Sequence, residues 1–99
     1  MYYPVSAHLI EFLILSVLQK EDSYGYEISR TVKLVADIKE STLYPILKKL
    51  EKNGFMTTYT KEYQGRKRKY YSLTDAGVEE LKFLNSEWIS YRDTIDDIR

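Results

Sequence analysis

Residues 39–54 carry the side chains of this chain that are best suited to contact a nucleic acid. Hydroxyl groups stand near the beginning of the stretch, and lysines follow at the spacing of one helix face. A hydroxyl can hydrogen-bond to the edge of a base, whereas an ammonium group pairs with a phosphate. On a helix, this order would place the hydroxyls in a DNA major groove and the lysines beside the backbone. The candidate contact residues are Ser41, Thr42, Tyr44, Pro45, Lys48, Lys49 and Lys52.

The same stretch has the pattern of an amphipathic helix, with an apolar stripe that recurs at the spacing of one helix face. We expect Ser41 or Thr42 to provide the N-cap hydroxyl and Asn53-Gly54 to provide the left-handed exit. Because Pro45 has no amide hydrogen, it should lie in the first turn. An ordinary surface helix with solvated lysines is the alternative. The apolar stripe consists of Leu43, Ile46, Leu47 and Leu50.

Residues 55–73 have the twofold period of a β-hairpin. Residues 55–63 are rich in Thr and Tyr, as strands are, residues 64–67 form the expected turn, and residues 68–73 form the return strand. The tip carries a run of basic residues, of which Arg66, Lys67 and Arg68 are candidates to hold DNA phosphates. Exposed hairpins also carry basic residues to protect their edges, but four in succession favour DNA.

Two helices are expected before residue 39, after a loose arm over residues 1–5. Ser6 can cap a first helix that runs to about residue 20 and is apolar around nearly its whole circumference, which indicates that a partner subunit covers part of it. Ser23 can cap a second helix that runs to about Val35. Two helices joined by a short connection and followed by a basic hairpin form a winged helix-turn-helix. The buried stripe of the second helix should consist of Tyr24, Ile28, Val32 and Val35.

A long last helix is expected from the cap residue Thr74 to about Ile98. Its apolar residues alternate at intervals of three and four, which is the seam of a coiled coil. A helix of about 25 residues is about 37 Å long, which is more than the preceding domain can cover, so we expect a homodimer through this helix. The candidate dimerisation residues are Leu81, Leu84, Trp88, Tyr91, Ile95 and Ile98.

Trp88 and Tyr91 lie mid-seam and are the candidate effector-binding residues. Two indoles that face each other across a twofold axis pack poorly, and a gap walled by aromatic rings can accept a planar hydrophobic small molecule. The alternative is that Trp88 is simply part of the interface core, as aromatic seam residues usually are.

The composition of the 99-residue chain, 43% hydrophobic and 30% charged, is typical of one small globular unit. Its net charge is zero, but residues 39–69 hold nine basic and three acidic residues, a net charge of +6. Residues 75–99 hold seven acidic and three basic residues, a net charge of −4. This distribution gives a basic working surface. We therefore expect a mainly α fold with a small β-hairpin: a DNA-binding winged helix-turn-helix over residues 1–73 and a C-terminal dimerisation helix over residues 74–99, in one compact unit.

An enzyme is not expected. The chain has one histidine, no cysteine, no glycine-rich phosphate loop and no pair of residues suited to nucleophilic catalysis. We predict no cofactor and no metal site, since Asp93, Asp96 and Asp97 are typical of a solvated acidic helix end. The lack of cysteine fits the cytoplasm. The apolar run Leu9 to Leu18 is too short to span a bilayer, so no membrane association is expected.

Four motifs in this order resemble the signature of PadR-type transcriptional regulators. They are Tyr24-Gly-Tyr-Glu-Ile28, Ser41-Thr-Leu-Tyr-Pro-Ile-Leu47, Leu50-Glu-Lys-Asn-Gly54 and Gly65-Arg-Lys-Arg-Lys-Tyr-Tyr-Ser-Leu-Thr-Asp-Ala-Gly77. The resemblance covers nearly the whole chain and implies a dimeric winged helix-turn-helix repressor that responds to a small molecule. With a single C-terminal helix, the chain resembles the short subfamily. Trp88 resembles the tryptophan of multidrug-sensing members, in which a pair of tryptophans lines a pore at the dimer centre.

A twofold symmetric protein of this kind is expected to bind double-stranded DNA at a pseudo-palindromic operator. The alternative from another functional class is a winged helix that contacts another protein and no DNA. That alternative predicts an uncharged hairpin and a helix face without lysine, and neither is present in this sequence.

Overall fold

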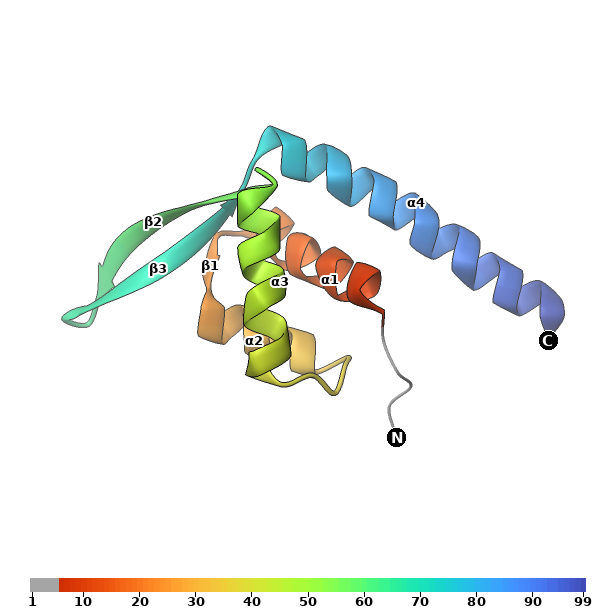
Figure 1. Cartoon of the computed structure of the whole chain (residues 1–99), viewed down its shortest axis with the longest axis horizontal. Coiled ribbons are helices and arrows are strands. Elements are labelled where there is room, and N and C mark those ends of the chain that lie inside the picture. Colours follow the sequence, from red (N-terminus) through yellow and green to blue (C-terminus); the bar gives the residue numbers. More distant parts are fainter. Residues whose placement is uncertain (1–5) are drawn as a thin grey trace.

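Residues 6–99 of the computed structural model form four helices and a three-stranded antiparallel sheet (Figure 1). The arm expected over residues 1–5 lies outside these described residues. The winged helix-turn-helix with a long C-terminal helix is thereby confirmed. The elements are α1 (Ala7–Lys20), β1 (Ser23–Tyr24), α2 (Gly25–Lys33), α3 (Glu40–Lys52), β2 (Met56–Tyr63), β3 (Arg66–Leu73) and α4 (Asp75–Ile98).

Helix α1 is the centre of the core, because α2, α3, β3 and α4 all pack on it. Ser6 caps it as expected, and its Oγ accepts a hydrogen bond of 3.2 Å from the backbone N–H of Leu9. Ile14 and Leu15 are completely buried. The chain itself therefore covers much of the apolar circumference that suggested a partner subunit.

Helix α2 begins at Gly25, so the prediction that Ser23 caps it is wrong. Ser23 is buried in strand β1, where it pairs with Tyr71 of β3. Its hydroxyl donates a hydrogen bond of 2.6 Å to Glu27 Oε1 and does not cap the helix. Residue 24 is the extended N-cap and makes no side-chain capping bond.

The other end of α2 also differs from the prediction. The helix ends at Lys33, and the expected stripe residue Val35 is 52% exposed. Ala36, in the connection, is buried in its place, while Ile28 and Val32 are buried as predicted. The stripe fails at position 35 because the chain has left the helix there, so the helical spacing no longer decides which side chain points inward.

Helix α3 spans Glu40–Lys52, so the expected N-cap by Ser41 or Thr42 is wrong. The N-cap is Lys39, which makes no side-chain capping bond. Glu40 in the first turn favours this earlier start, because a carboxylate is stabilised by the positive end of the helix dipole.

Pro45 is the sixth residue of α3 and lies in its second turn, not in the first as expected. The early helix start is held from α2, since Lys33 Nζ is 2.6 Å from Glu40 Oε1 and Ser29 Oγ donates to the same oxygen at 3.4 Å. The exit is confirmed: Gly54 has φ of 81°, the left-handed conformation that a glycine adopts without strain.

The hairpin turn is shorter than the predicted segment 64–67. Gln64 and Gly65 have φ of 51° and 78°, so they form a two-residue type I′ turn, whose twist matches that of the strands. Strand β3 therefore begins at Arg66, which pairs with Tyr63. Strand β1 was not predicted from the sequence, and its two residues add a third strand in the order β1-β3-β2.

Helix α4 is capped by Thr74 as predicted, with Oγ1 accepting a hydrogen bond of 3.0 Å from the backbone N–H of Gly77. Its first half packs on α1 through Leu81 and Leu84, which are 4% and 3% exposed. The second half extends away from the rest of the chain (Figure 1). None of the helices in residues 6–99 is long and apolar enough to cross a membrane.

Candidate nucleic-acid interface

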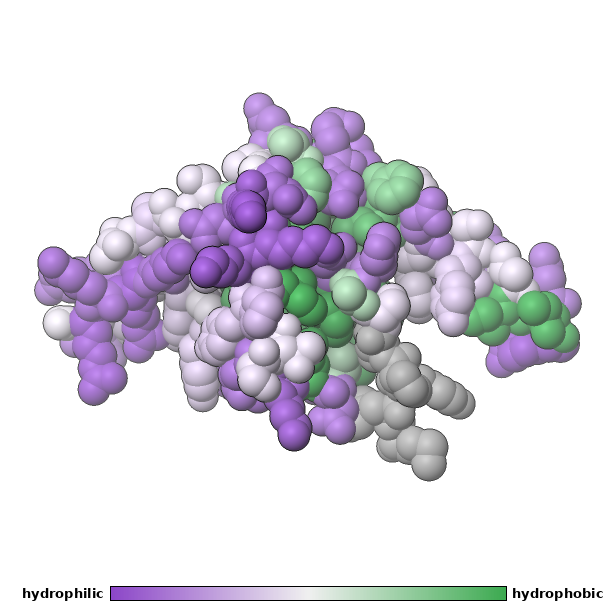
Figure 2. All heavy atoms as spheres, viewed as in Figure 1, coloured by the Kyte–Doolittle hydropathy of each residue, from purple (hydrophilic) through white to green (hydrophobic). Residues whose placement is uncertain are grey.

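The outer face of α3 is polar and exposed, while its inner face is built into the core. Leu43, Leu47 and Leu50 are at most 1% exposed, and Ile46 is half-buried against them. The seven candidate DNA contacts on this helix are all exposed. Hydrophilic side chains gather on the face that α3 presents and again at the tip of the hairpin (Figure 2). The seven are Ser41, Thr42, Tyr44, Pro45, Lys48, Lys49 and Lys52.

Lys49 differs from the other lysines of α3 because a carboxylate of the same chain holds its ammonium group. Its Nζ lies 3.0 Å from Oε1 of Glu11, whose side chain is only 6% exposed. A buried carboxylate needs such a partner, since leaving it unpaired costs several kcal/mol. The role of Glu11 was not predicted, and its only indication in the sequence is an acidic residue inside an apolar helix.

Glu51 of α3 ties the hairpin to this helix. Its Oε2 accepts a hydrogen bond of 3.3 Å from Thr58 of β2, and its Oε1 is 3.3 Å from Nζ of Lys69 on β3. Burial acts to lower the pKa of Lys69, but the hydrogen bond and charge of Glu51 outweigh it, and the pKa lies above its usual value. Lys69 therefore stays a cation at any ordinary pH, which preserves its contact with α3.

The basic residues of the hairpin divide into two environments. Arg66 and Lys67 are exposed at the tip, beside the two-residue turn. Arg68 is half-buried, and its guanidinium lies 4.4 Å from the ring centroid of Tyr24 and 5.2 Å from that of Tyr63. All three residues were predicted from the sequence to contact phosphates, and in the structure the first two are more open to solvent than Arg68.

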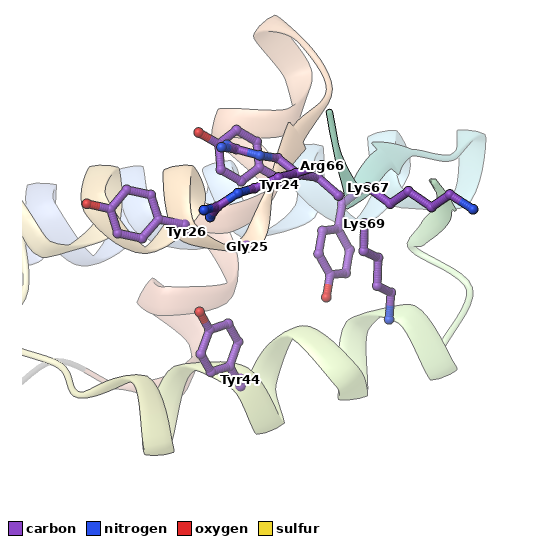
Figure 3. Close-up of a pocket in the computed structure, with 9 residues that line it drawn as sticks. Tyr24, Gly25, Tyr26, Tyr44, Arg66, Lys67 and Lys69 are labelled. Carbon is purple, nitrogen blue, oxygen red and sulfur yellow. The ribbon is translucent and has the colours of Figure 1, made fainter. Parts of the chain in front are cut away.

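An open groove of about 470 Å³ lies between the hairpin and the first half of α3. Tyr24 and Tyr26 stand on one side of it, and Tyr44 of α3 points across from the other (Figure 3). The ring of Tyr44 lies against Gly25, where an added Cβ would be only 3.2 Å from Tyr44 Cε1. Its remaining lining residues are Arg66, Lys67, Arg68, Lys69 and Tyr71.

The groove joins the exposed face of α3 and the hairpin tip into one basic surface. A convex helix flanked by a basic hairpin matches a duplex, in which the major groove accepts the helix and the adjacent backbone meets the hairpin. Two ion-pair links, Glu40 with α2 and Glu51 with the hairpin, fix how α3 is presented. The Lys33 hydrogen bond is the main reason why the pKa of Glu40 lies below its usual value.

The candidate dimerisation residues of α4 divide at the middle of the helix. Leu81 and Leu84 are buried by α1 of the same chain, so each is a core residue of the single chain. Trp88 is half-buried, with its ring centroid 6.2 Å from that of Tyr91. Tyr91, Ile95 and Ile98 beyond it are 62%, 39% and 80% exposed.

In the part of the chain that the structure describes, no group of histidine, cysteine, aspartate or glutamate side chains is placed to hold a metal ion. The three aspartates near the end of α4 do not converge on one point. Arg92 lies 3.5 Å from Asp93, and Arg99 lies 3.3 Å from Asp96.

Residues 14–83 match the transcriptional regulator PadR-like family. The chain belongs to this family. PadR-family proteins are transcription regulators and not enzymes, so this chain is a DNA-binding regulator of transcription.

Relatives of known structure have the same fold along nearly the whole chain. The protein smu.1704 of Streptococcus mutans UA159 is 66% identical, with a TM-score of 0.96 over 99% of this chain and 92% of its own. A PadR family transcription regulator of Clostridium difficile R20291 is 35% identical, with a TM-score of 0.83 over 90% of this chain and 96% of its own.

A third relative is longer than this chain. The negative transcriptional regulator PadR of Bacillus subtilis strain 168 is 39% identical over an alignment of 79 residues that covers 74% of this chain and 43% of that protein. This PadR-family chain therefore spans less than half of that regulator.

Proposed function

We propose that this PadR-family protein is a homodimeric, cytoplasmic repressor that binds a pseudo-palindromic operator and is released by a planar hydrophobic small molecule. The observation that supports DNA binding best is the common basic surface of α3 and the hairpin tip. The groove is lined by Tyr44 of α3 and by Arg66 and Lys67 of the hairpin, and the exposed lysines of α3 lie further along the same helix. The name of the Bacillus subtilis relative, a negative regulator, supports the repressor role.

Two kinds of contact are proposed on this surface. Thr42, Tyr44 and Lys48 are the candidates for contacts with base edges, because they stand on the exposed first half and middle of α3. Lys52, Arg66 and Lys67 are the candidates for phosphate contacts. Ser41 and Pro45 flank the base-contacting residues. Lys49 reaches a phosphate only if it shares its ammonium group with the buried Glu11.

The two kinds of contact are separable by the salt dependence of duplex binding. Arg66→Ala should weaken binding to all sequences alike and flatten the slope of log K against log salt by about 0.9 for each phosphate that is no longer neutralised, about 1.8 in a dimer. Thr42→Ala should instead reduce the preference for operator over random DNA with little change in slope.

The operator itself is obtained by sequencing genomic fragments that the purified protein retains. We expect an inverted repeat with half-sites about 34 Å apart or a multiple of that distance. If the protein retains no duplex at moderate salt, the surface serves a protein partner instead, and the DNA proposal is wrong.

The second half of α4 is the proposed centre of the dimer interface. It carries apolar and aromatic residues that its own chain leaves exposed, namely Tyr91, Ile95 and Ile98. A second copy related by a twofold axis would cover them. Leu81 and Leu84 contribute by fixing α4 against α1, from which the second half extends.

The aromatic pair of Trp88 and Tyr91 is the proposed effector site. The two rings stack at 29° to each other on the half of α4 assigned to the interface, where a planar compound could lie against them. A ligand between the two copies would change the spacing of the two α3 helices, so ligand and DNA binding would oppose each other. If Trp88 is only interface core, no such compound binds.

Fluorescence tests the effector site directly, because Trp88 is the only tryptophan of the chain. Planar aromatic dyes should quench its emission saturably and weaken the operator complex. No quenching at up to roughly millimolar dye, where binding is worth only about 4 kcal/mol, would remove the effector proposal and leave the DNA proposal intact.

A further inference from the structure

The face of the sheet opposite the core carries a cluster of aromatic and basic side chains. Strand register places alternate residues of β2 and β3 on this face, while Met56 and Tyr71 point into the core from the other. Four tyrosines and two cations come together on it from all three strands. They are Tyr24, Tyr59, Lys61, Tyr63, Arg68 and Tyr70.

Arg68 links the strands within this cluster. It lies on the middle strand β3, with Tyr24 of β1 on one side at 4.4 Å and Tyr63 of β2 on the other at 5.2 Å. Planar guanidinium groups stack well on aromatic faces, and each such contact is worth about 0.5–1 kcal/mol at an exposed site.

The rest of the cluster continues the same packing towards the base of the hairpin. The ring of Tyr70 stacks on Tyr59 at 5.6 Å and meets Tyr24 edge-on at 5.5 Å. Lys61 Nζ lies 5.5 Å from the centroid of the Tyr70 ring. The ring faces are therefore largely occupied by one another and by cations of the same chain, so the cluster has the character of a second small core and not of an empty stacking platform.

The position of Tyr24 gives the cluster a connection to the helix-turn-helix. Tyr24 is the N-cap of α2 as well as a residue of β1. Tyr63 pairs with Arg66 near the turn of the hairpin. Because Arg68 contacts both Tyr24 and Tyr63, it fixes the outer part of the hairpin relative to α2. The link through Glu51, on the opposite face, fixes the hairpin relative to α3.

We propose that Arg68 is a positioning residue, which acts by clamping the hairpin between Tyr24 and Tyr63 so that Arg66 and Lys67 meet the DNA backbone, and not by binding a phosphate itself. The inference rests on the proposed contact of the hairpin tip with DNA. It is an alternative to the sequence-based prediction that Arg68 contacts a phosphate.

The test compares Arg68→Ala with the matched variant Arg66→Ala, using the full chain and a fluorescein-labelled duplex of about three helical turns. Both substitutions remove one arginine, so they differ only in its place. Arg66→Ala should flatten the salt slope. Arg68→Ala should weaken binding about fivefold and leave the slope unchanged, because removing the guanidinium from between two rings changes the position of the hairpin and not the number of phosphates neutralised.

Two further variants separate charge from stacking. Arg68→Lys keeps the charge but lacks the planar group, so it should restore little of the affinity. Tyr24→Leu removes one ring and no charge, so it should weaken binding at an unchanged slope. Combined with Arg68→Ala, it should weaken binding little further, because both substitutions break the same contact.

NMR of the free protein provides a readout that needs no DNA. Ring currents from Tyr24 and Tyr63 should shift the δ-protons of Arg68 upfield of those of Arg66, and Tyr24→Leu should reduce this shift. Coincident signals for the two arginines would mean that the clamp does not exist in solution, and the inference would be wrong.

The binding results overturn the inference in two ways. If Arg68→Ala flattens the slope as much as Arg66→Ala and Arg68→Lys restores the affinity, Arg68 is a phosphate contact. If Arg68→Ala leaves affinity unchanged, it positions nothing. If Arg66→Ala is itself without effect, the proposed DNA contact of the hairpin tip fails as well, and that result differs from the other two.

Discussion

Gly77 lies in the first turn of α4, where even the addition of one methyl group should destabilise the fold. A Cβ added there would lie 2.0 Å from the carbonyl oxygen of Phe55 and 2.7 Å from Cδ1 of Leu73. Because Cβ atoms essentially never approach a neighbour within 3.0 Å, α4 or the backbone at Phe55 would have to move by about 1 Å. The contact to a backbone oxygen is the decisive one, since a side chain could rotate away and a carbonyl in this junction cannot.

The junction around Gly77 is held by short hydrogen bonds that such a movement would disturb. Thr74 Oγ1 accepts from the N–H of Gly77 at 3.0 Å and donates to the carbonyl of Gly54 at 2.6 Å, while the N–H of Thr74 donates to the carbonyl of Phe55 at 3.2 Å. Overpacking costs about 1–3 kcal/mol, and the loss of a helix cap costs about 1 kcal/mol. The better helix propensity of alanine offsets about 1 kcal/mol.

Gly77→Ala should therefore lower the free energy of unfolding by about 1–3 kcal/mol, which corresponds to a fall in Tm of about 5–25 °C. Helix propensity alone predicts that Gly77→Ala raises the free energy of unfolding, so the experiment separates the local preference of the helix from the tertiary contact with Phe55. Urea denaturation followed by circular dichroism at one fixed protein concentration measures the change, since a dimer unfolds in a concentration-dependent way. Ala76→Gly, at the exposed neighbouring position, is the control and should cost only about 1 kcal/mol. A Gly77→Ala protein as stable as the wild type would refute the close approach of α4 to Phe55.

Two further predictions concern α4 and the sheet. Leu84→Asp should unfold the chain, because it places a charge in the core of the single subunit, whereas Ile95→Asp should give folded monomers. Light scattering with circular dichroism distinguishes the two outcomes. A dimeric Ile95→Asp protein would contradict the proposed interface. Asp22 accepts a hydrogen bond of 2.7 Å from the Tyr59 hydroxyl and thereby raises the pKa of Tyr59 above its ordinary value near 10.0. The stability that this hydrogen bond contributes is therefore present below pH 10.0 and is lost as the pH rises through the raised pKa of Tyr59. Asp22→Asn should bring the pKa of Tyr59, measured by NMR titration, back towards 10.0. An unchanged titration would mean that the hydrogen bond is absent.

The helices and the hairpin were predictable because each carries its own periodic signal. The stripe of α3, the Thr74 cap and the left-handed Gly54 depend only on neighbours within one or two turns, and the structure confirms them. The start of α3 depends on Lys33 of another helix, so the hydroxyl of Ser41 gave a misleading local signal. A two-residue strand such as β1 has no period to detect, and only its pairing with β3 defines it.

The function of single side chains was harder to predict than the elements that carry them. The run from Arg66 to Lys69 looks uniform in the sequence, but in a strand its members alternate between two faces, and Lys69 points to Glu51 while Arg68 points to Tyr24. The seam of α4 was predicted from a pattern of apolar residues alone. A pattern does not state which surface covers it, and the half containing Leu84 proved to be covered by α1.

The contact between Gly25 and Tyr44 couples a residue of α2 to the surface of α3 that is proposed to bind DNA. With only 3.2 Å between an added Cβ and the Tyr44 ring, position 25 limits the size and angle of the side chain at position 44. Among relatives, the two positions are therefore expected to vary together, with a large aromatic residue at 44 accompanied by glycine at 25. A change of operator preference could then arise from a substitution at position 25, since an added methyl group there would redirect the Tyr44 ring, which is proposed to contact a base.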